Sequence, residues 1–515
     1  MRSNIALPTE PIVTIQESLR PALPLVFGSK DYRDQEQLIE RIDLVLRKSG
    51  IEQLFVRLSL EEHEAGSAKK IITDKDRSRA AQERSRHAKR SEQVLRCNVL
   101  RSILGESFRG ISKRLAECEL FRQFCKLEEL EIVRVPSKST LQDYEKWLPQ
   151  EKMKQVLDAL TLALGDAEKA AEMGLEAALT MEVAYVDTTC LKANIHFPAD
   201  WILMRDGIRS LIKTITTIRC HGLKKRMPEP SIFIKEINSL CIAMTAAHRK
   251  ADGKKQKKNI VRLMKRLTNT VKSHAQRYRN TLDQEWSKTD WTRKQAEMML
   301  RHLDNILVQL PEAIRQAHER IIGERQVASE KKILSFYEKE IHVINRGKHG
   351  AQVEFGNTLL IAEEVSGYIL AHELVEKQSP GDAKLLIKHC SNLQAVTNHR
   401  LLAIGGDRQF DSAATNRLLA KEKIYNGLCP KNPQELSRRM QENEPLKKML
   451  KRRAQSEGRI GIVKNVFLQG TPKAKGYKNR AMQVTWAVLA HNLWLVARKA
   501  SWKKAELSPE MALAA

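Results

Sequence analysis

Long apolar runs are missing from this sequence, and so are cysteine motifs. No stretch reaches the ~20 consecutive apolar residues that a membrane-spanning helix needs. The segment from Met1 to Pro11 has no apolar core, which predicts no signal peptide and a cytoplasmic protein. The 515 residues include eight cysteines, none with C-x-x-C spacing. We therefore expect neither a zinc site nor a disulfide framework.

Acidic residues are in short supply relative to basic ones. Asp and Glu number 62 against 89 Lys and Arg, which gives a net charge of +27. This excess predicts a polyanionic partner, with nucleic acid as the first expectation and an inert basic surface as the alternative. A membrane surface is less favoured, because no single helical pattern pairs a broad apolar face with a basic one.

The spacing of apolar side chains divides the chain into regions, in line with the roughly two to four domains expected at this length. We predict an N-terminal helical and basic region over 1–90 and a helical, helix-turn-helix-like DNA-binding region over 91–180. A domain that mixes strands with helices follows over 181–470, with a helical insertion at about 205–335, and a C-terminal helical tail covers 471–515.

Three helical segments stand out within these regions. One pattern runs from Gln35 to Leu60, and the last long helix is expected over Gln434–Val466. Between them, Ser137 or Ser139 is placed to cap a helix, with Lys138 near its start. A helix-turn-helix that reads DNA has this pattern, and so has a plain helical hairpin.

Apolar strands in the mixed domain lead to two aspartates. Val183–Val186 reads as a buried strand ending at Asp187, and Leu401–Gly406 as another ending at Asp407. Gly356 followed by Asn357 indicates a turn between two of the other strands. Those other strands are expected at Ile341–Ile344, Val353–Phe355, Leu359–Ala362 and Gly367–Leu370.

A third acid, Glu457, lies on the helix predicted downstream. Arg453 and Lys464 stand four residues before it and seven after it, which puts both cations on its helical face. Three well-placed carboxylates are enough to hold two Mg²⁺ ions, which activate a nucleophile and stabilise the leaving oxygen in phosphoryl transfer. An aspartate that ends a strand is, taken alone, more often a turn residue or a cap, and the helix is compatible with ordinary salt bridges.

Taken in order, these blocks resemble the DDE transposases of bacterial insertion sequences. The first-acid block is Asp187–Thr189 with Asn194–Asp200, the second is Gly406–Ser412 and the third is Glu457–Ile460. The family's helix signature is Tyr, two residues, Arg, three residues, Glu, six residues, Lys. Arg453, Glu457 and Lys464 fit it, while the tyrosine position holds Leu450, so no tyrosine role is carried over.

The resemblance runs from about residue 95 to residue 497 and implies a fold and an activity. It implies an RNase H-like mixed α/β fold whose sheet is flanked by helices and interrupted after its first strand by the helical insertion. The implied activity is cleavage at the ends of an insertion sequence and strand transfer into target DNA. Asp187, Asp407 and Glu457 are the implied catalytic residues and ligands of two Mg²⁺ or Mn²⁺ ions.

The partner implied by the resemblance is double-stranded DNA, both terminal inverted repeats and target, bound by a homodimer in association with the bacterial nucleoid. Nine basic residues are the candidate DNA contacts. They are the two helix cations Arg453 and Lys464, Lys138 near the capping serine, the basic run Lys254, Lys255, Lys257 and Lys258 of the insertion, and Arg346 with Lys348 beside a strand.

Several alternatives remain open at this level. A nuclease with the same core that never joins DNA, or a non-catalytic DNA-binding relative, fits the same pattern. His196 and Asp200 are expected in a structural loop rather than in the site. Trp286 and Trp291 are expected in a helical core rather than stacked on an unpaired base. The rival acids, which lack one or other supporting feature, are Asp206, Asp411, Glu442 and Glu444.

Overall fold

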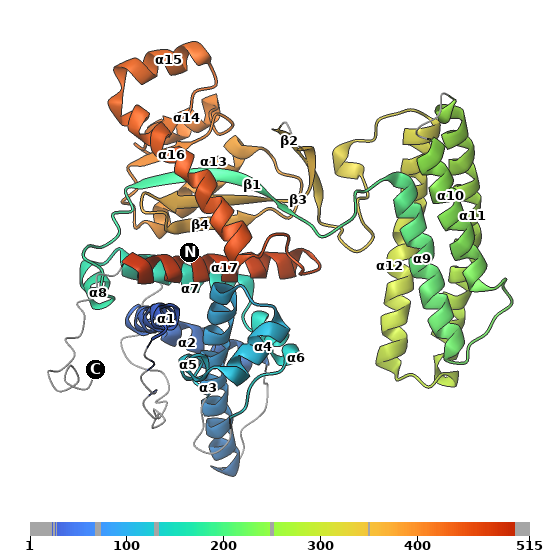
Figure 1. Ribbon diagram of the computed structural model, residues 1–515, viewed down its shortest axis with the longest axis horizontal. Helices are drawn as coiled ribbons and strands as arrows, with labels where there is room; N and C mark the ends of the chain where they lie inside the picture. Colours follow the sequence, from blue (N-terminus) through green and yellow to red (C-terminus); the bar gives the residue numbers. More distant parts are fainter. Residues whose placement is uncertain are drawn as a thin grey trace.

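The computed structural model is a mixed α/β protein in which a sheet with surrounding helices lies beside a separate group of long helices (Figure 1). In the part of the chain that it describes, no helix is long and apolar enough to cross a membrane. For 74–77, 346–348 and 351–352 only the backbone is described. The residues described are 23, 26, 28–66, 74–127, 133–247, 252–348 and 351–499.

The N-terminal part folds as a layer of helices. The single pattern expected over Gln35–Leu60 is two helices, because Ser49 ends the first and Gly50, at φ +77°, turns the chain. The predicted cap is confirmed: Ser137 accepts a hydrogen bond from the backbone N–H of Thr140. The helices are α1 (Lys30–Lys48), α2 (Ile51–Gly66), α3 (Asp74–Leu104), α4 (Phe108–Glu117), α5 (Glu119–Phe124), α6 (Lys138–Glu145), α7 (Gln150–Leu164) and α8 (Ala167–Glu172).

The sheet combines antiparallel and parallel pairs. Its order is β2-β3-β1-β5-β6, and β4 pairs with the second half of β3. β1 is antiparallel to β3 and parallel to β5, which is parallel to β6. The strands are β1 (Val183–Lys192), β2 (His342–Lys348), β3 (Ala351–Glu364), β4 (Ile369–Leu374), β5 (Ala403–Gly406) and β6 (Tyr425–Leu428).

The turn expected at Gly356 and Asn357 is wrong, because β3 runs through both residues. Gly356 fits there since any Cβ would lie 2.0 Å from the carbonyl oxygen of Leu191 on β1. Asn357 is fully buried and donates from its amide to the carbonyl oxygens of Glu340 and Val375. A close backbone approach and a satisfied buried amide therefore replace the turn.

The helical insertion is a group of helices with a hydrophobic core of its own (Figure 1). Its first helix begins at Asp200, and the chain returns to the sheet through a linker that ends at Ile341. The elements are α9 (Asp200–Cys220), α10 (Pro230–Ala247), α11 (Gly253–Glu285), α12 (Arg293–Ala317), two 3₁₀ turns at Trp286–Lys288 and Ser329–Lys331, and a π-helical turn at His318–Ile322.

The chain leaves the sheet through further helices. The long helix expected over Gln434–Val466 is interrupted, because Asn443 is extended at φ −131° and caps a new helix by accepting from the N–H of Leu446. The elements are α13 (Asp382–Val396), α14 (Ala413–Lys421), α15 (Pro433–Glu442), α16 (Glu444–Ile462), a π-helical turn η4 (Val463–Phe467) and α17 (Tyr477–Lys499).

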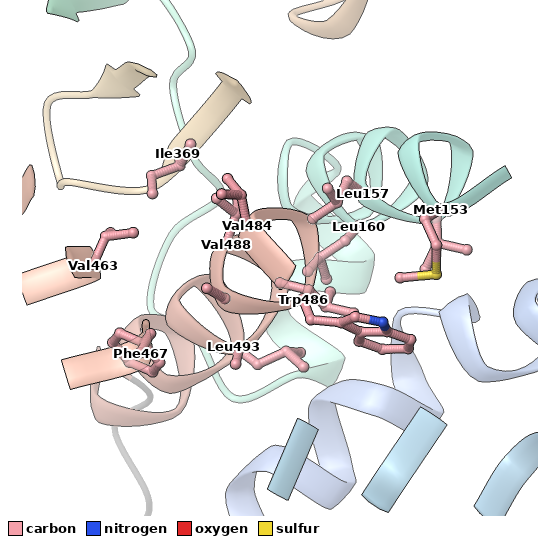
Figure 2. Close-up of a cluster of buried hydrophobic side chains, with 14 of the residues drawn as sticks. Met153, Leu157, Leu160, Ile369, Val463, Phe467, Val484, Trp486, Val488 and Leu493 are labelled. Carbon is pink, nitrogen blue, oxygen red and sulfur yellow. The ribbon is translucent and has the colours of Figure 1, made fainter. Parts of the chain in front are cut away.

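Helix α17 is the centre of the main hydrophobic core. It lies between the sheet and the N-terminal helices, where Trp486 is fully buried and donates from its indole N–H to the carbonyl oxygen of Glu145 (Figures 1 and 2). One continuous cluster joins it to α7, β4 and η4. The segment expected as a tail from residue 471 thus contains a helix buried on most of its surface, and the core does not divide at residues 90, 180 or 470.

Candidate active site

The register of β1 and β5 brings two of the predicted acids together. The two strands are parallel, and their last pair is Val186 with Gly406. Asp187 follows Val186 within β1, and Asp407 follows Gly406 directly after β5, so the two acids are neighbours where β5 ends. Asp187 does not end its own strand as expected, because the antiparallel partner β3 continues and carries β1 on to Lys192.

Each aspartate is held by a backbone N–H. Oδ1 of Asp187 accepts from the N–H of Thr188 at 2.7 Å. Oδ1 of Asp407 accepts from the N–H of Gln409 at 2.8 Å, in the loop that follows β5. One oxygen of each carboxylate is thus fixed, and the other has no hydrogen bond to the part of the chain that the structure describes.

Helix α16 is attached to the sheet along one face. Arg452 and Ser456 reach Oε1 of the buried Glu363 at 3.1 and 2.7 Å. Arg452 also donates to the carbonyl oxygen of Val365, and Arg459 to that of Ser366. Arg452, Ser456 and Arg459 are spaced so that they lie on one face of α16. The neighbouring face, which carries Glu457, is therefore turned away from Glu363.

That next face lines a cavity of about 690 Å³, which all three predicted acids share. Asp187 comes from β1, Asp407 from the end of β5, and Glu457 with Lys464 from the helical segment above the sheet. Asp187 precedes Asp407 by 220 residues and Asp407 precedes Glu457 by 50, and the fold brings all three to one cavity.

The electrostatics of the cavity disfavour the charged form of its central acid. Burial raises the pKa of Asp187 to about 6, and the charges of Asp407 and Glu457 add to the rise. The hydrogen bond from Thr188 and the charge of Arg453 act in the opposite direction. Asp187 therefore lies within the electrostatic reach of both other acids and of the predicted cation on α16.

The two helix cations have different surroundings. The ammonium of Lys464 donates to the carbonyl oxygen of Cys190 at 2.8 Å and to Oγ1 of Thr189 at 3.3 Å, so it is tied to β1 while lining the cavity. Arg453 is half-buried beside the cavity, and the described part of the chain offers it no ion pair. Lys464 lies in the π-helical turn η4 and lines the same cavity as Glu457, in agreement with the spacing that predicted both on one side of the helix.

Two further acids line the cavity, and the sequence interpretation missed them. Asp382, in the first turn of α13, accepts from the hydroxyl of Thr188 at 3.0 Å. Glu354 on β3 pairs with Lys192 at 3.1 Å. Asp382 follows Gly381 before a helix, which is an ordinary capping pattern, and Glu354 lies in a strand. Asp382 has no signal in the sequence that points to a site. Glu354 belongs to the segment Glu354–Gly356, which also resembles the transposase family, although the resemblance does not mark it as a site acid.

Lys138 and the basic run of the insertion do not line this cavity. Lys138 is exposed at the start of α6, and the basic run begins α11. In that run, Lys254 and Lys258 both pair with Glu324, at 3.5 and 2.8 Å. The side chains of Arg346 and Lys348, at the end of β2, lie outside the described residues.

Asp200 and the two tryptophans occupy structural positions, whereas His196 is exposed on the loop that follows β1. Asp200 is buried and accepts from Gln316 and Arg320, which joins the start of α9 to the end of the insertion. Trp286 and Trp291 pack against the insertion's core. The rival acids have partners outside the cavity or lie on the exposed ends of α15 and α16: Asp206 with Arg205, Asp411 with Asn416 and the N–H of Lys431, Glu442, and Glu444.

The donor set of the cavity suits a hard cation in kind. The cavity gathers five carboxylates, from Asp187, Glu354, Asp382, Asp407 and Glu457, and carboxylate oxygens are the ligands that Mg²⁺ prefers. This local excess of acids stands out in a chain with a net charge of +27. Over the described ranges, no three His, Cys, Asp or Glu side chains are gathered closely enough to form a finished metal site. A scan of protein-family models and searches of curated proteins and of solved structures return no match for this chain.

Proposed function

We propose that the chain is a DNA transposase with an RNase H-like core, which cuts DNA at the ends of an insertion sequence and joins it to a target. One observation carries the proposal. Asp187, Asp407 and Glu457, singled out in that order by the sequence, converge on a single cavity. A mixed sheet flanked by helices and interrupted after its first strand by a helical insertion also supports the RNase H-like assignment.

The three acids fit divalent ions by charge as well as by chemistry. Mutual repulsion among Asp187, Asp407 and Glu457 contributes to the raised pKa of Asp187, and a cation between them would relieve it. Each aspartate keeps one oxygen available for a ligand. The exposed side chain of Glu457 has room to turn toward the other two. Mg²⁺ or Mn²⁺ bound here would supply an activated water or 3′-hydroxyl and charge stabilisation at the leaving oxygen.

The chain's own residues would hold and orient the substrate. Lys464 is held on β1 at one wall of the cavity, and Arg453 on α16 is close enough for its charge to act on Asp187. Both offer positive charge to a phosphate that approaches the acids. The hydrogen bonds from Thr188 and Gln409 keep the two carboxylates in one orientation, so little reorganisation is needed when the substrate binds.

Nicking of a supercoiled plasmid that carries the gene with its flanking DNA tests the proposal. Asp407→Asn and Glu457→Gln should each lower the Mg²⁺-dependent rate by at least about a hundredfold, because charge compensation at the phosphoryl group is removed. Asp411→Asn and Glu444→Gln are matched controls, since both acids lie outside the cavity, and they should cut like the unaltered protein.

Joined products in the same reaction separate the transposase from a simple nuclease. Linear fragments inserted into a second plasmid are expected. Cleavage without any insertion would assign a nuclease, and cleavage that survives Asp407→Asn would remove this cavity from the chemistry. DNA binding without cleavage in any divalent metal would leave the non-catalytic alternative.

A further inference from the structure

A second cavity, of about 560 Å³, lies where the helical insertion meets the sheet. One wall is the connector from β1 to α9, including Asn194 and Phe197. The opposite wall is the first half of α9 together with the return linker, where Tyr337 lies. Its volume lies within the range of pockets that hold a small organic ligand, roughly 300–1,000 Å³.

The aromatic side chains of this cavity are unusually exposed. Phe197 is 75% exposed, although its ring is held at one side by the edge-to-face contact with Phe355 at 5.4 Å. Tyr337 is 46% exposed, and its hydroxyl is hydrogen-bonded to that of Ser210. Fixed apolar rings open to solvent are the informative exception on a protein surface.

Positive charge surrounds these rings. Arg205 is paired with Asp206, and Glu338, the other acid of the lining, is paired with Arg480. Arg209 and Lys475 also line the cavity, both are exposed, and the described part of the chain supplies neither with an ion pair. The paired acids thus leave two cations facing solvent.

Buried contacts support both walls of the cavity. Beneath it, Ala193, Leu334 and Ile341 form a small buried cluster that joins the outgoing connector to the returning linker. On the insertion side, the bonds of Asp200 with Arg320 hold the start of α9. These contacts tie both walls of the groove to the rest of the fold.

We propose that this groove binds an unpaired nucleotide of a DNA strand, with the base against Phe197 and the phosphates against Arg209 and Lys475. Aromatic rings interleaved with cations are the pattern by which proteins take single-stranded nucleic acid. The proposal rests on the proposed function for the identity of the polymer as DNA, and it assigns a role to the Asn194–Asp200 segment that the three acids leave unexplained.

The groove and the catalytic cavity are separate places on one chain. Phe197 follows Asp187 by ten residues, of which the first half lies in β1, so the two are at most roughly 33 Å apart along the strand direction. A single DNA molecule can therefore reach both. The unpaired nucleotide would lie several nucleotides away from the phosphate that is cut.

Binding of a 12-residue single-stranded oligothymidine, labelled at one position with 2-aminopurine, tests this with the full chain in EDTA. Phe197→Ala should weaken binding about tenfold and abolish the fluorescence quenching caused by stacking. Phe197→Leu should do the same, because it keeps an apolar side chain but has no ring. Val308→Ala, at an equally exposed site on α12 outside the groove, is the control and should bind normally.

The salt dependence of binding tests the role of Arg209 and Lys475. Arg209→Ala with Lys475→Ala should weaken oligonucleotide binding and reduce the slope of log affinity against log salt by about 0.7 for each phosphate that the protein no longer neutralises. A fully paired duplex of the same length should be insensitive to Phe197→Ala. Equal weakening on duplex and single strand would overturn the claim of an unpaired nucleotide.

The two proposals fail separately. If Phe197→Ala binds the oligonucleotide as Val308→Ala does, the groove is overturned, while plasmid nicking by the unaltered protein still supports the transposase. If no metal supports nicking but Phe197→Ala still fails to bind the single strand, the groove stands and the proposed reaction falls.

Discussion

The acids could be selected from the sequence because each carried a local signal. Asp187 and Asp407 follow apolar runs, and Glu457 is flanked by Arg453 and Lys464 at helical spacing. Asp382 carried no such signal, since its place in the cavity depends on how α13 packs against β1. A hydrogen bond between residues almost two hundred positions apart cannot be read from either neighbourhood.

The raised pKa of Asp187 makes a prediction about stability. The folded pKa of about 6 exceeds the ordinary value of 3.8, so the folded protein holds this proton more tightly than the unfolded chain does. Stability should then fall as the pH rises from about 4 to about 6, and remain lower above that range. A difference of about two pKa units corresponds to roughly 3 kcal/mol.

Asp187→Asn should remove that penalty. At pH 8 without divalent metal, we expect the variant to be more stable than the unaltered protein by up to about 3 kcal/mol. Near pH 4 the difference should largely vanish, because Asp187 is then neutral in the folded state. Urea denaturation at both pH values measures this, with Asp411→Asn as control. A gain that is the same at pH 4 and pH 8 would contradict the electrostatic cause.

Divalent ions should stabilise the protein through the same acids. At a concentration 100 times the dissociation constant, binding adds about 2.7 kcal/mol to the free energy of unfolding. We expect Mg²⁺ and Mn²⁺ to raise the melting temperature of the unaltered protein, and Asp407→Asn to remove most of the rise. Ca²⁺ should bind but support little cleavage, because its coordination is looser. Full activity in EDTA would exclude the metal mechanism.

At the scale of elements, the attachment of α16 decides where its acid lies. Glu363 is buried between Arg452, Ser456 and Arg459, and these contacts fix the rotation of the helix. Because the bonds come from one face, Glu457 on the neighbouring face is directed to the cavity. The orientation of the helix thus depends on a residue of β3 that takes no part in the proposed chemistry.

Glu363→Gln should therefore impair cleavage from outside the cavity. Removal of the buried charge leaves the arginines without their partner, at a cost on the order of 3 kcal/mol. We expect the cleavage rate to fall although all three acids are intact. Glu442→Gln, exposed at the end of α15, is the control. Normal cleavage by a clearly destabilised Glu363→Gln protein would separate the attachment of α16 from activity.

Whether a segment forms a strand or a helix could be predicted from the sequence, whereas the points at which helices and strands are interrupted could not. The strands that lead to Asp187 and Asp407 and the helical insertion follow from apolar spacing. The interruption at Asn443 and the passage of β3 through Gly356 do not, because each is decided by a partner: the N–H of Leu446 in one case and the backbone of β1 in the other. β6, only four residues long, gave no usable pattern.

At the scale of the molecule, the basic run of the insertion contains two lysines that are paired with an acid and, over the described residues, two that are not. Glu324 engages Lys254 and Lys258, while Lys255 and Lys257 have no ion pair among the residues described. The four lysines predicted to act alike therefore differ in how much charge they offer to a phosphate. Exposed ion pairs of this kind add little to stability, so their effect should be on DNA binding.

Lys255→Ala with Lys257→Ala should weaken binding to all DNA sequences alike. The slope of log affinity against log salt should become shallower by up to about 1.8, at 0.9 for each phosphate that a lysine neutralises. Glu324→Gln should have the opposite effect, because it releases two lysines. Titrations at several salt concentrations with terminal-repeat and random duplexes measure both. Unchanged slopes in the two variants would make this surface a solvated face and no more.

The burial of α17 sets an order of events during synthesis. The helices before residue 105 and the strands of the sheet are all made before α17, yet this helix fills the face that they share. Until α17 has left the ribosome, that face has no Trp486 to cover it, and α7, β4 and η4 lack their common neighbour (Figure 2). The chain should thus complete its core only after α17 has been made, and a copy that lacks this helix should be cleared by proteases before it meets DNA.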